Sequence, residues 1–260
     1  IMLCSVLISN FNKSKYLEKC LNSVKDQTYD KIEIIFSDNG STDNSMSILS
    51  SFTDIKILKT ERSTEYPALN QIEVLVNAFE MSKGDYIFLL DSDDFFEKDK
   101  IEKVIKYKSL NNSEVIFDIP RLYKDEKNSK IFKSKSFYNP LRSWPIIFPT
   151  SSISFTRKFF LNFRDFLFEK KYEKLEIDTR LNIFSHIEKK RVLFDQILTN
   201  YNQNNDGIMS KFKKFNKNWW HRRFQAHEYL NKICTMKNYK VNKNFDYYLT
   251  NFIYEMLKNK

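Results

Sequence analysis

The chain alternates between short apolar runs and longer segments in which apolar residues recur every three or four positions. The runs are too short for buried helices and rich in strand-forming residues, so they predict strands at residues 2–9, 31–37, 54–60, 85–90 and 113–119. The periodic segments predict amphipathic helices at residues 16–24, 46–49, 66–82 and 101–108. Strands that alternate with helices in this way indicate a parallel sheet wound with crossover helices.

The second half of the chain carries a weaker pattern. Four of the five prolines lie at residues 120–149, which predicts a loop-rich middle. Residues 150–163 predict a strand and a helix, residues 177–190 a helix and residues 191–201 an extended segment. The last fifty residues predict two helices, and the second has an apolar stripe formed by Phe245, Tyr248, Leu249, Phe252, Ile253, Met256 and Leu257.

Polar turns follow three of the predicted strands at the point where each strand ends. These turns are SNFNKS at residues 9–14, SDNGSTD at residues 37–43 and DSDD at residues 91–94. Because ligands bind beyond the carboxyl ends of the strands in wound sheets, we expect the turns to converge on one crevice. Glycine is scarce, so each of the three, Gly40, Gly84 and Gly207, is expected to occupy a backbone position that other residues cannot take.

The composition is that of a globular protein. The 260 residues suffice for one large domain or two small ones, and 42% hydrophobic residues suffice for a sizeable core. No window approaches the roughly 18 apolar residues of a membrane span. No secretory signal opens the sequence, although Ile1 leaves the natural start open. The cysteines, Cys4, Cys20 and Cys234, are odd in number and widely spaced, which argues against a disulfide framework or zinc site and for a reducing compartment.

The net charge of +10 is concentrated near the end of the chain. Residues 210–260 contain twelve Lys and Arg against three Asp and Glu, interleaved with aromatic residues that include Trp219 and Trp220. A basic aromatic helix can lie on an anionic membrane surface, or it can pack on the protein and leave its lysines solvated. The same mixture could stack on nucleic acid bases, but nucleic acid is not expected because it leaves the acidic turn unexplained.

The acidic turn at residues 91–94 predicts a metal site. Crowded carboxylates raise one another's pKa unless a cation shares the site. The D-x-D formed by Asp91, Ser92 and Asp93 offers hard oxygen ligands, which suit Mg²⁺ or Mn²⁺, and such ions also bind substrate phosphates. Capping of a helix is the alternative and would suit Asp94, but three carboxylates exceed what a cap needs. A divalent ion here would stabilise a diphosphate leaving group.

Several segments together resemble an inverting family-two glycosyltransferase with a GT-A fold. They are SVLISNFNKSKYLEKCLNSVKDQTYDKIEIIFSDNGSTDNS, KGDYIFLLDSDD, PTSSISFTRKFF, IDTRL and LFDQILTNYNQNNDGIMS, which cover about residues 3–210. The resemblance implies an α/β fold with a mostly parallel wound sheet flanked by helices. It divides the chain into a catalytic domain at residues 1–209 and a basic helical extension at 210–260. Within the domain, residues 1–118 would bind the nucleotide sugar and residues 119–209 the acceptor.

The resemblance also assigns donor-binding residues. The first loop would meet the nucleotide, and the second turn, where the family has DDGS, would contact the base. Because the second position of that turn is Asn39, the base is less certain, although a UDP-linked donor is expected. Asp91 would face the sugar or ribose and, with Asp93, the metal. The donor-binding residues implied are Ser9, Asn10, Phe11, Asp38, Asn39, Asp91 and Ser92.

The catalytic base of the family is an Asp in an ED pair that opens a helix. Asp178 matches that Asp and would take the proton of the acceptor hydroxyl, although its partner Glu is replaced by Ile177. Glu176 is a rival base, and a capping role for Asp178 is the alternative. Asn204 replaces a family His near the diphosphate. Trp144 could stack on an acceptor sugar, with core packing an equal alternative.

These residues predict a metal-dependent, inverting glycosyltransferase. It would move a sugar from a nucleotide-diphosphate sugar to a bacterial surface glycan or a lipid-linked acceptor, in the cytoplasm or on the inner face of the cell membrane. A nucleotidyltransferase on a similar sheet is the alternative enzyme, but SNFNKS is not its Gly-rich phosphate loop. A nucleic-acid-binding protein using the basic segment is the alternative outside enzymes.

Overall fold

The computed structural model describes residues 2–124, 128–132, 143–167, 169–203, 213–241 and 243–258. The strands are β1 Cys4–Asn10, β2 Ile32–Asp38, β3 Ile55–Lys59, β4 Tyr86–Asp91, β5 Phe95–Phe96, β6 Val115–Tyr123, β7 Ser129–Ile131, β8 Ile153–Thr156 and β9 Arg191–Asn202. The α-helices are α1 Ser14–Lys25, α2 Ser45–Leu49, α3 Pro67–Met81, α4 Lys100–Leu110, α5 Arg157–Phe163, α6 Ile177–Ile187, α7 Lys217–Met236 and α8 Phe245–Lys258. The short 3₁₀ helices are η1 Thr150–Ser152, η2 Arg164–Phe166 and η3 Lys170–Tyr172.

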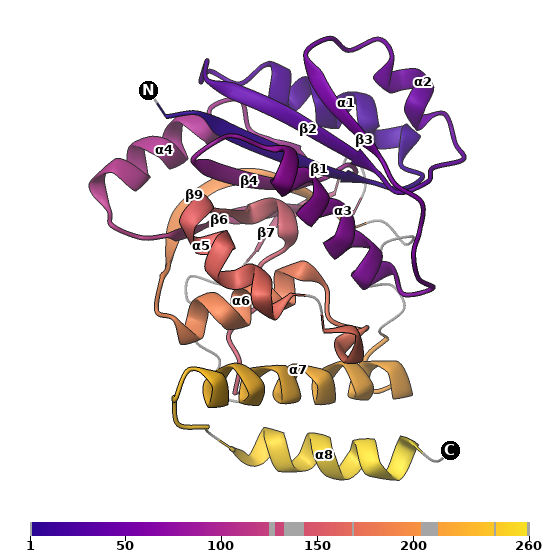
Figure 1. The fold of residues 1–260 in the computed structure, drawn as a ribbon, viewed down its shortest axis with the longest axis vertical. Coiled ribbons are helices and arrows are strands. Elements are labelled where there is room, and N and C mark those ends of the chain that lie inside the picture. The colour runs from indigo at the N-terminus through magenta and orange to yellow at the C-terminus, as the bar shows by residue number, and fades with distance from the viewer. Residues whose placement is uncertain are drawn as a thin grey trace.

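One mixed sheet runs through the molecule, in the strand order β3-β2-β1-β4-β8-β6-β9-β5, with β7 paired to β6 (Figure 1). Strands β3, β2, β1 and β4 are parallel, as the alternating pattern predicts. Strand β8 is antiparallel to both of its neighbours, β4 and β6, whereas β9 is parallel to β6. The predicted α/β fold, mostly parallel and flanked by helices, is therefore confirmed, and β8 is the antiparallel insertion that joins its two halves.

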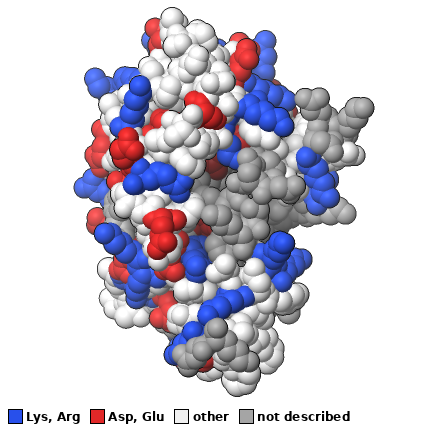
Figure 2. Space-filling view, turned by 90° about the vertical axis from the view of Figure 1, so that its right-hand side faces the viewer, with Lys and Arg blue, Asp and Glu red and all other residues white. Residues whose placement is uncertain are grey.

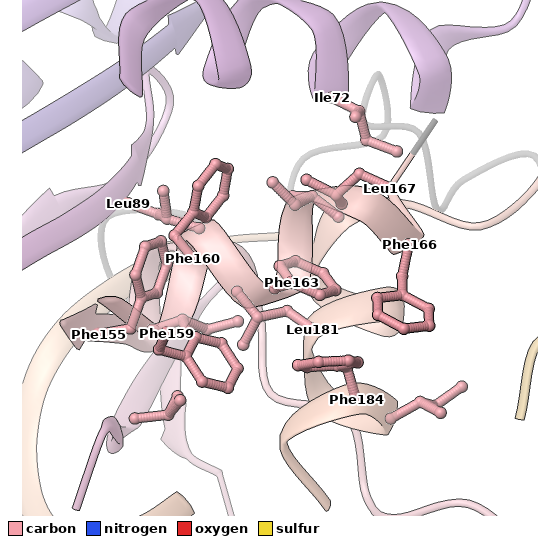
Figure 3. Packing of buried hydrophobic residues seen from close by; sticks show 14 of the residues in the cluster. Ile72, Leu89, Phe155, Phe159, Phe160, Phe163, Phe166, Leu167, Leu181 and Phe184 are labelled. Atoms are coloured by element: carbon pink, nitrogen blue, oxygen red, sulfur yellow. The ribbon is translucent and has the colours of Figure 1, made fainter. Parts of the chain in front are cut away.

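Two apolar clusters pack on the sheet. Helix α1 buries its periodic apolar face, as predicted, in the cluster that also contains residues of β1, β4 and α4. Helices α3, α5, α6 and α7 contribute to the larger cluster, which is rich in phenylalanine (Figure 3). There Phe155 stacks on Phe160 with ring centroids 5.4 Å apart, and Phe163 and Phe166 both contact Phe184. These contacts join β8 and α5 to α6, so they hold α6 in its position against the sheet.

The predicted helical extension consists of α7 and α8, at the end of the molecule opposite α2 (Figure 1). Helix α7 buries part of its length in the larger cluster through Ala226, Tyr229, Leu230 and Ile233. Helix α8 packs on α7, where Tyr254 stacks on Phe224 with ring centroids 4.0 Å apart. Of the α8 residues only Thr250 is buried. The apolar stripe predicted for this helix therefore faces largely outward.

Two glycines sit where a side chain would not fit. Gly40 has φ +72°, the left-handed region that favours glycine. A Cβ at Gly84 would lie 2.7 Å from the backbone nitrogen of Ser5, because the segment entering β4 crosses closely over the start of β1. Both expectations from glycine scarcity are met, and Gly207 lies outside the described residues.

Two local expectations are corrected. The segment after residue 120 is more regular than a loop, because β6 continues to Tyr123 and pairs with β7. Asp94 does not cap a helix: α4 begins only at Lys100, after the short strand β5. Asp94 is instead a buried residue of the turn after β4, and its backbone nitrogen donates to the carbonyl oxygen of Asp91 at 2.9 Å.

Candidate active site

The carboxyl ends of β1, β2 and β4 meet at one edge of the sheet. The strand register places Asn10 opposite Asp38, and Ser9 opposite Asp91. Hydrogen bonds connect these pairs: Ser9 Oγ donates to Asp91 Oδ1 at 2.7 Å, and Asn10 Nδ2 donates to Asp38 Oδ1 at 2.8 Å. The three polar turns therefore converge, as the sheet topology required.

The side chains of the second turn are mostly engaged within the protein. Asp38 is buried, and its second carboxylate oxygen accepts from the backbone nitrogen of Ser41 at 2.9 Å. Asn39 is also buried, and its backbone nitrogen donates to the carbonyl oxygen of Asn10. Phe11 lies further out and stacks under the guanidinium of Arg62, 4.1 Å from the ring centroid. Phe11 belongs to the first turn, and its side chain is exposed, whereas Asp38 and Asn39 of the second turn are buried.

Three carboxylates crowd the turn after β4. Burial, and then the charge of Asp93, raise the pKa of Asp91 to about 6. Burial, and then Asp93 and Asp91, raise the pKa of Asp94 well above its usual range. Ser92 is buried beside them, and its backbone nitrogen donates to the carbonyl oxygen of Ser9. The site holds more negative charge than its own hydrogen bonds compensate.

A lysine that the sequence pattern did not single out lies in this site. Lys13, just before α1, places its ammonium nitrogen 2.9 Å from Asp93 Oδ2. Gln71 of α3 also reaches the site and donates to Asp91 Oδ1 at 2.9 Å. Lys13 precedes the predicted helix at residues 16–24, and Gln71 lies within the predicted helix at residues 66–82. The turn sequence SNFNKS contains Lys13 and could have indicated it, whereas no sequence signal indicated Gln71.

A buried polar network supports the turn from below. Ser151 of η1 donates to Asp94 Oδ2 at 2.6 Å and accepts from the backbone nitrogen of Asp91 at 3.0 Å. The fully buried ammonium of Lys100 donates to the Ser151 carbonyl oxygen at 2.6 Å and pairs with Asp118 Oδ2 at 2.8 Å. An ion pair in the core therefore fixes the backbone that carries the carboxylates.

The predicted base lies across from this turn. Asp178 is in the first turn of α6, and its carboxylate accepts from the backbone nitrogen of Thr179. Burial, and then Glu176, raise the pKa of Asp178 to about 7, with Asp91 adding a smaller repulsion and Arg222 opposing it. Asp91 of the β4 turn is therefore among the charges that act on the predicted base.

Glu176, the rival base, has a different environment. It is buried, and Arg222 of α7 binds its Oε2 through two nitrogens, at 2.7 and 3.0 Å. Arg222 also donates to Thr179 Oγ1 at 2.6 Å. Both nitrogens of Arg222 occupy Glu176 Oε2, so that oxygen is not open to an acceptor hydroxyl, and the geometry favours Asp178. The sequence did not single out Arg222, because it lies in a basic run that resembles a solvated surface.

Tyr201, at the end of β9, is a further residue that the sequence did not indicate. Burial, and then the charges of Asp94 and Asp178, raise the pKa of its hydroxyl, with smaller contributions from Asp91 and Asp93. Its phenol therefore stays protonated near neutral pH and can donate a hydrogen bond.

Of the other two expected site residues, only Trp144 lies within the described part of the chain. Trp144 is only 5% exposed; His227 contacts its ring edge-on, with ring centroids 4.5 Å apart, and Arg223 lies over it. The ring therefore packs in the core and offers no face to an acceptor sugar, which corrects that expectation. Asn204 lies outside the described residues.

The carboxylates suit a divalent ion by their chemistry. Among the described residues no three His, Cys, Asp or Glu side chains form a ready metal-binding group. Mg²⁺ and Mn²⁺ commonly use one or two carboxylates and take their remaining oxygens from water and substrate phosphates. Asp91 and Asp93 match that arrangement, and the ion pair of Asp93 with Lys13 shows that this turn accepts a cation. Within the described ranges, no helix has both the length and the apolarity to cross a bilayer.

Known proteins share this fold. TarS of S. aureus, in a structure of residues 1–349 with UDP, superimposes with a TM-score of 0.66 at 14% identity, over 99% of this chain and 71% of that chain. The mannosyltransferase PcManGT of Pyrobaculum calidifontis, in complex with GDP-Man and Mn²⁺, gives 0.63 at 16% identity, over 99% and 71%. Both likenesses concern the fold, which is of the GT-A type.

Sequence relationships are more specific. TuaG of Bacillus subtilis, named as a glycosyltransferase of teichuronic acid biosynthesis, is 34% identical over 110 residues, which are 40% of this chain and 41% of TuaG. The chain spans less than half of the length of several curated relatives that it matches. The model of the family described as Glycosyl transferase family 2 matches residues 5–171, more than half of the chain. The turn residues of β1, β2 and β4 all fall inside that match, and the chain belongs to glycosyl transferase family 2.

Proposed function

We propose that this protein transfers a sugar from a nucleotide-diphosphate sugar, UDP-linked, to a hydroxyl group of a glycan acceptor, with inversion at the anomeric carbon. One observation carries the proposal: Asp91 of the β4 turn is among the charges that raise the pKa of Asp178, which lies on a separate element. A donor bound at the turn would present its reacting carbon toward a base on α6.

The donor would lie along the edge formed by β1, β2 and β4. Ser9, Asn10 and Phe11 would contact the nucleotide, with the base near Asp38 and Asn39. Asp91 and Ser92 would face the ribose or the sugar. The structure of TarS with UDP supports a uridine nucleotide, whereas PcManGT was solved with GDP-Man, so the base is the part of the donor that requires the experiment below.

Asp93 and Asp91 would hold a Mn²⁺ or Mg²⁺ ion. When bound, the ion would neutralise charge that develops on the departing diphosphate. Burial, and then the charge of Asp93, raise the pKa of Asp91, and a cation between the two carboxylates would relieve their repulsion. The Mn²⁺ in the PcManGT complex is a second support. Lys13, which already pairs with Asp93, would add a second positive charge on the same side.

Asp178 would act as the catalytic base. Its carboxylate would take the proton of the acceptor hydroxyl while the hydroxyl oxygen bonds to the anomeric carbon. The bond from that carbon to the diphosphate oxygen breaks, and its electron pair leaves with the nucleoside diphosphate. A pKa of about 7 suits a base that must be ionised near neutral pH and still accept a proton.

The acceptor would be a bacterial surface glycan or its lipid-linked precursor. TuaG, which is named for teichuronic acid biosynthesis, supports the first class. We further propose a cytoplasmic location at the inner face of the cell membrane. The three cysteines, Cys4, Cys20 and Cys234, support a reducing compartment, because all three are buried and free.

The experiment is a screen of UDP- and GDP-sugars with Mn²⁺, Mg²⁺ or chelator, in which release of the nucleoside diphosphate is measured. We expect release that depends on metal and on one class of donor. With a glycan acceptor, proton NMR of the product should show the anomeric configuration opposite to that of the donor. Transfer of the nucleotide itself would instead identify a nucleotidyltransferase and overturn the proposal.

A further inference from the structure

Helix α8 presents an apolar face that no described part of the chain covers. Its inward face is committed to α7: Asp246 pairs with Arg223 and lies 3.2 Å from His227, and Tyr254 stacks on Phe224 and His221. The opposite face is exposed. Its residues and exposed fractions are Phe245 78%, Tyr248 60%, Leu249 37%, Phe252 65% and Met256 55%. We call these five residues the outer stripe.

Positive charge lies at both ends of the outer stripe. Helices α7 and α8 are antiparallel, since Arg223 meets Asp246 near the start of α8 and His221 meets Tyr254 near its end. The segment before α7 therefore lies toward the end of α8, and the α7–α8 connection lies at its start. Exposed lysines without an ion pair among the described residues occupy both places: Lys213, Lys214, Lys217, Lys240 and Lys243.

The surface view agrees with this arrangement. At the lower end of the molecule, where α7 and α8 lie, uncharged surface is bordered by Lys and Arg side chains (Figure 2). Phe215, just before α7, adds a further ring that is 71% exposed. Aromatic and aliphatic side chains on one helix face, with lysines beside them, are typical of helices that lie in the plane of a membrane surface.

The exposed lysines indicate which kind of partner binds the outer stripe. A second copy of the chain would bring the same unpaired lysines against themselves, which like-charge repulsion opposes. A surface of anionic lipid headgroups complements them, because each Lys or Arg near such a surface contributes about 1 kcal/mol. The stripe is a convex helix face with long aromatic side chains, which suits insertion among headgroups.

We propose that the α7–α8 hairpin docks on an anionic lipid bilayer, with the outer stripe inserted among the headgroups and the lysines on the lipid phosphates. The inference does not depend on which donor or acceptor is used. Docking would place the active site close to the bilayer, because Arg222 of α7 binds Glu176, two residues before Asp178.

The test is flotation of the full chain with phosphatidylcholine vesicles, with and without phosphatidylglycerol. We expect binding only to the anionic vesicles, weaker at high salt because exposed charges are screened. The triple variant Phe245→Gln, Phe252→Gln, Met256→Gln should bind about tenfold more weakly or worse. Its matched control is Met81→Gln, Leu110→Gln, Leu161→Gln, which removes three exposed apolar side chains from other helices and should bind as the wild type.

Two double variants, each with two lysines changed to glutamate, test whether the lysines bind the lipid phosphates. Lys240→Glu with Lys243→Glu should lower binding about tenfold or more, whereas Lys98→Glu with Lys106→Glu, also exposed lysines, changes the net charge equally and should have little effect. Thermal melts would verify that all variants are folded. Equal binding to both vesicle types, no binding to either, or equal loss in the control variants would overturn the proposal.

Discussion

Three neighbouring carboxylates illustrate how far the position and the environment of a single residue can be predicted from the sequence. The sequence indicated that Asp91, Asp93 and Asp94 share the tip of a strand, because the apolar run before them ends abruptly. It could not separate their environments, since the partners that differ, Lys13 for Asp93 and Ser151 for Asp94, come from distant segments. Tyr201 was missed for the same reason: nothing in its own neighbourhood distinguishes it from other aromatic residues.

Asp93→Ala should abolish metal-dependent turnover while the protein stays folded. Asp93 is the proposed metal ligand, and its loss also removes one charge from a crowded cluster, which offsets the lost pair with Lys13. We expect turnover with Mn²⁺ or Mg²⁺ to fall by about a hundredfold or more and the melting temperature to change little. Asp99→Ala, at a surface ion pair with Lys103, is the control and should keep full activity. Normal turnover by the Asp93 variant would contradict the metal assignment.

Asp178→Asn should keep donor binding and lose transfer, because the amide cannot accept the acceptor's proton. Calorimetry with the donor and a transfer assay would separate the two roles. In the wild type the transfer rate should rise as the pH passes about 7, where Asp178 ionises. If Asp178→Asn transfers at the wild-type rate, the base must be another group, and Glu176→Gln is the next variant to measure.

The same carboxylate has a consequence for stability. Because the native state holds the proton of Asp178 up to about pH 7, whereas the usual pKa of an exposed Asp is 3.8, ionising it in the folded protein costs free energy. This cost is absent below pH 3.8 and complete above pH 7. Asp178→Asn should therefore raise the melting temperature above pH 7, by about 2–4 °C for each kcal/mol removed, and leave it unchanged in acid. A pH-independent difference would contradict this.

At the scale of elements, the local sequence pattern predicted which strands form, but it did not predict how all of them pair. Every predicted strand of the first half exists, because each is an apolar run bounded by polar turns. The placement of β8 between β4 and β6 was not predictable, since it depends on pairing with strands about 70 and about 40 residues earlier in the chain. Strand β5 has two residues, too few to carry a period, and it exists because β9 offers a partner.

Helix α7 should influence the base on α6 through one ion pair. Arg222 lowers the pKa of Asp178, against burial, Glu176 and Asp91, which raise it. Arg222→Met should therefore move the rise of the transfer rate to higher pH, and Arg222→Lys should restore it in part, because the charge returns without the guanidinium geometry. Arg223→Met is a matched control, since Arg223 pairs with Asp246 of α8 instead. An unchanged pH profile for Arg222→Met would show that the pair is only structural.

For the whole molecule, the predicted boundary near residue 209 has a testable consequence. Helix α7 buries Ala226, Tyr229, Leu230 and Ile233 in the larger core cluster. Burying a large apolar side chain contributes about 1.5–3 kcal/mol, so their loss is comparable to the total stability of about 5–15 kcal/mol. A chain ending at residue 203 should fail to unfold cooperatively, whereas one ending at residue 241, which lacks only α8, should keep a cooperative melt at a lower temperature. A cooperative melt of the shorter chain would establish an independent domain.

Because of the packing around Trp144, the intrinsic tryptophan fluorescence of the protein reports selectively on helix α7. All three tryptophans gather at α7: Trp144 lies against His227 and Arg223, Trp219 also contacts Arg223, and Trp219 and Trp220 touch each other. The donor edge of the sheet contains none. Intrinsic fluorescence will therefore follow the docking of α7, while circular dichroism follows the helices and the sheet as a whole. If α7 detaches first, the two unfolding curves will separate, and the emission shift will record that event alone.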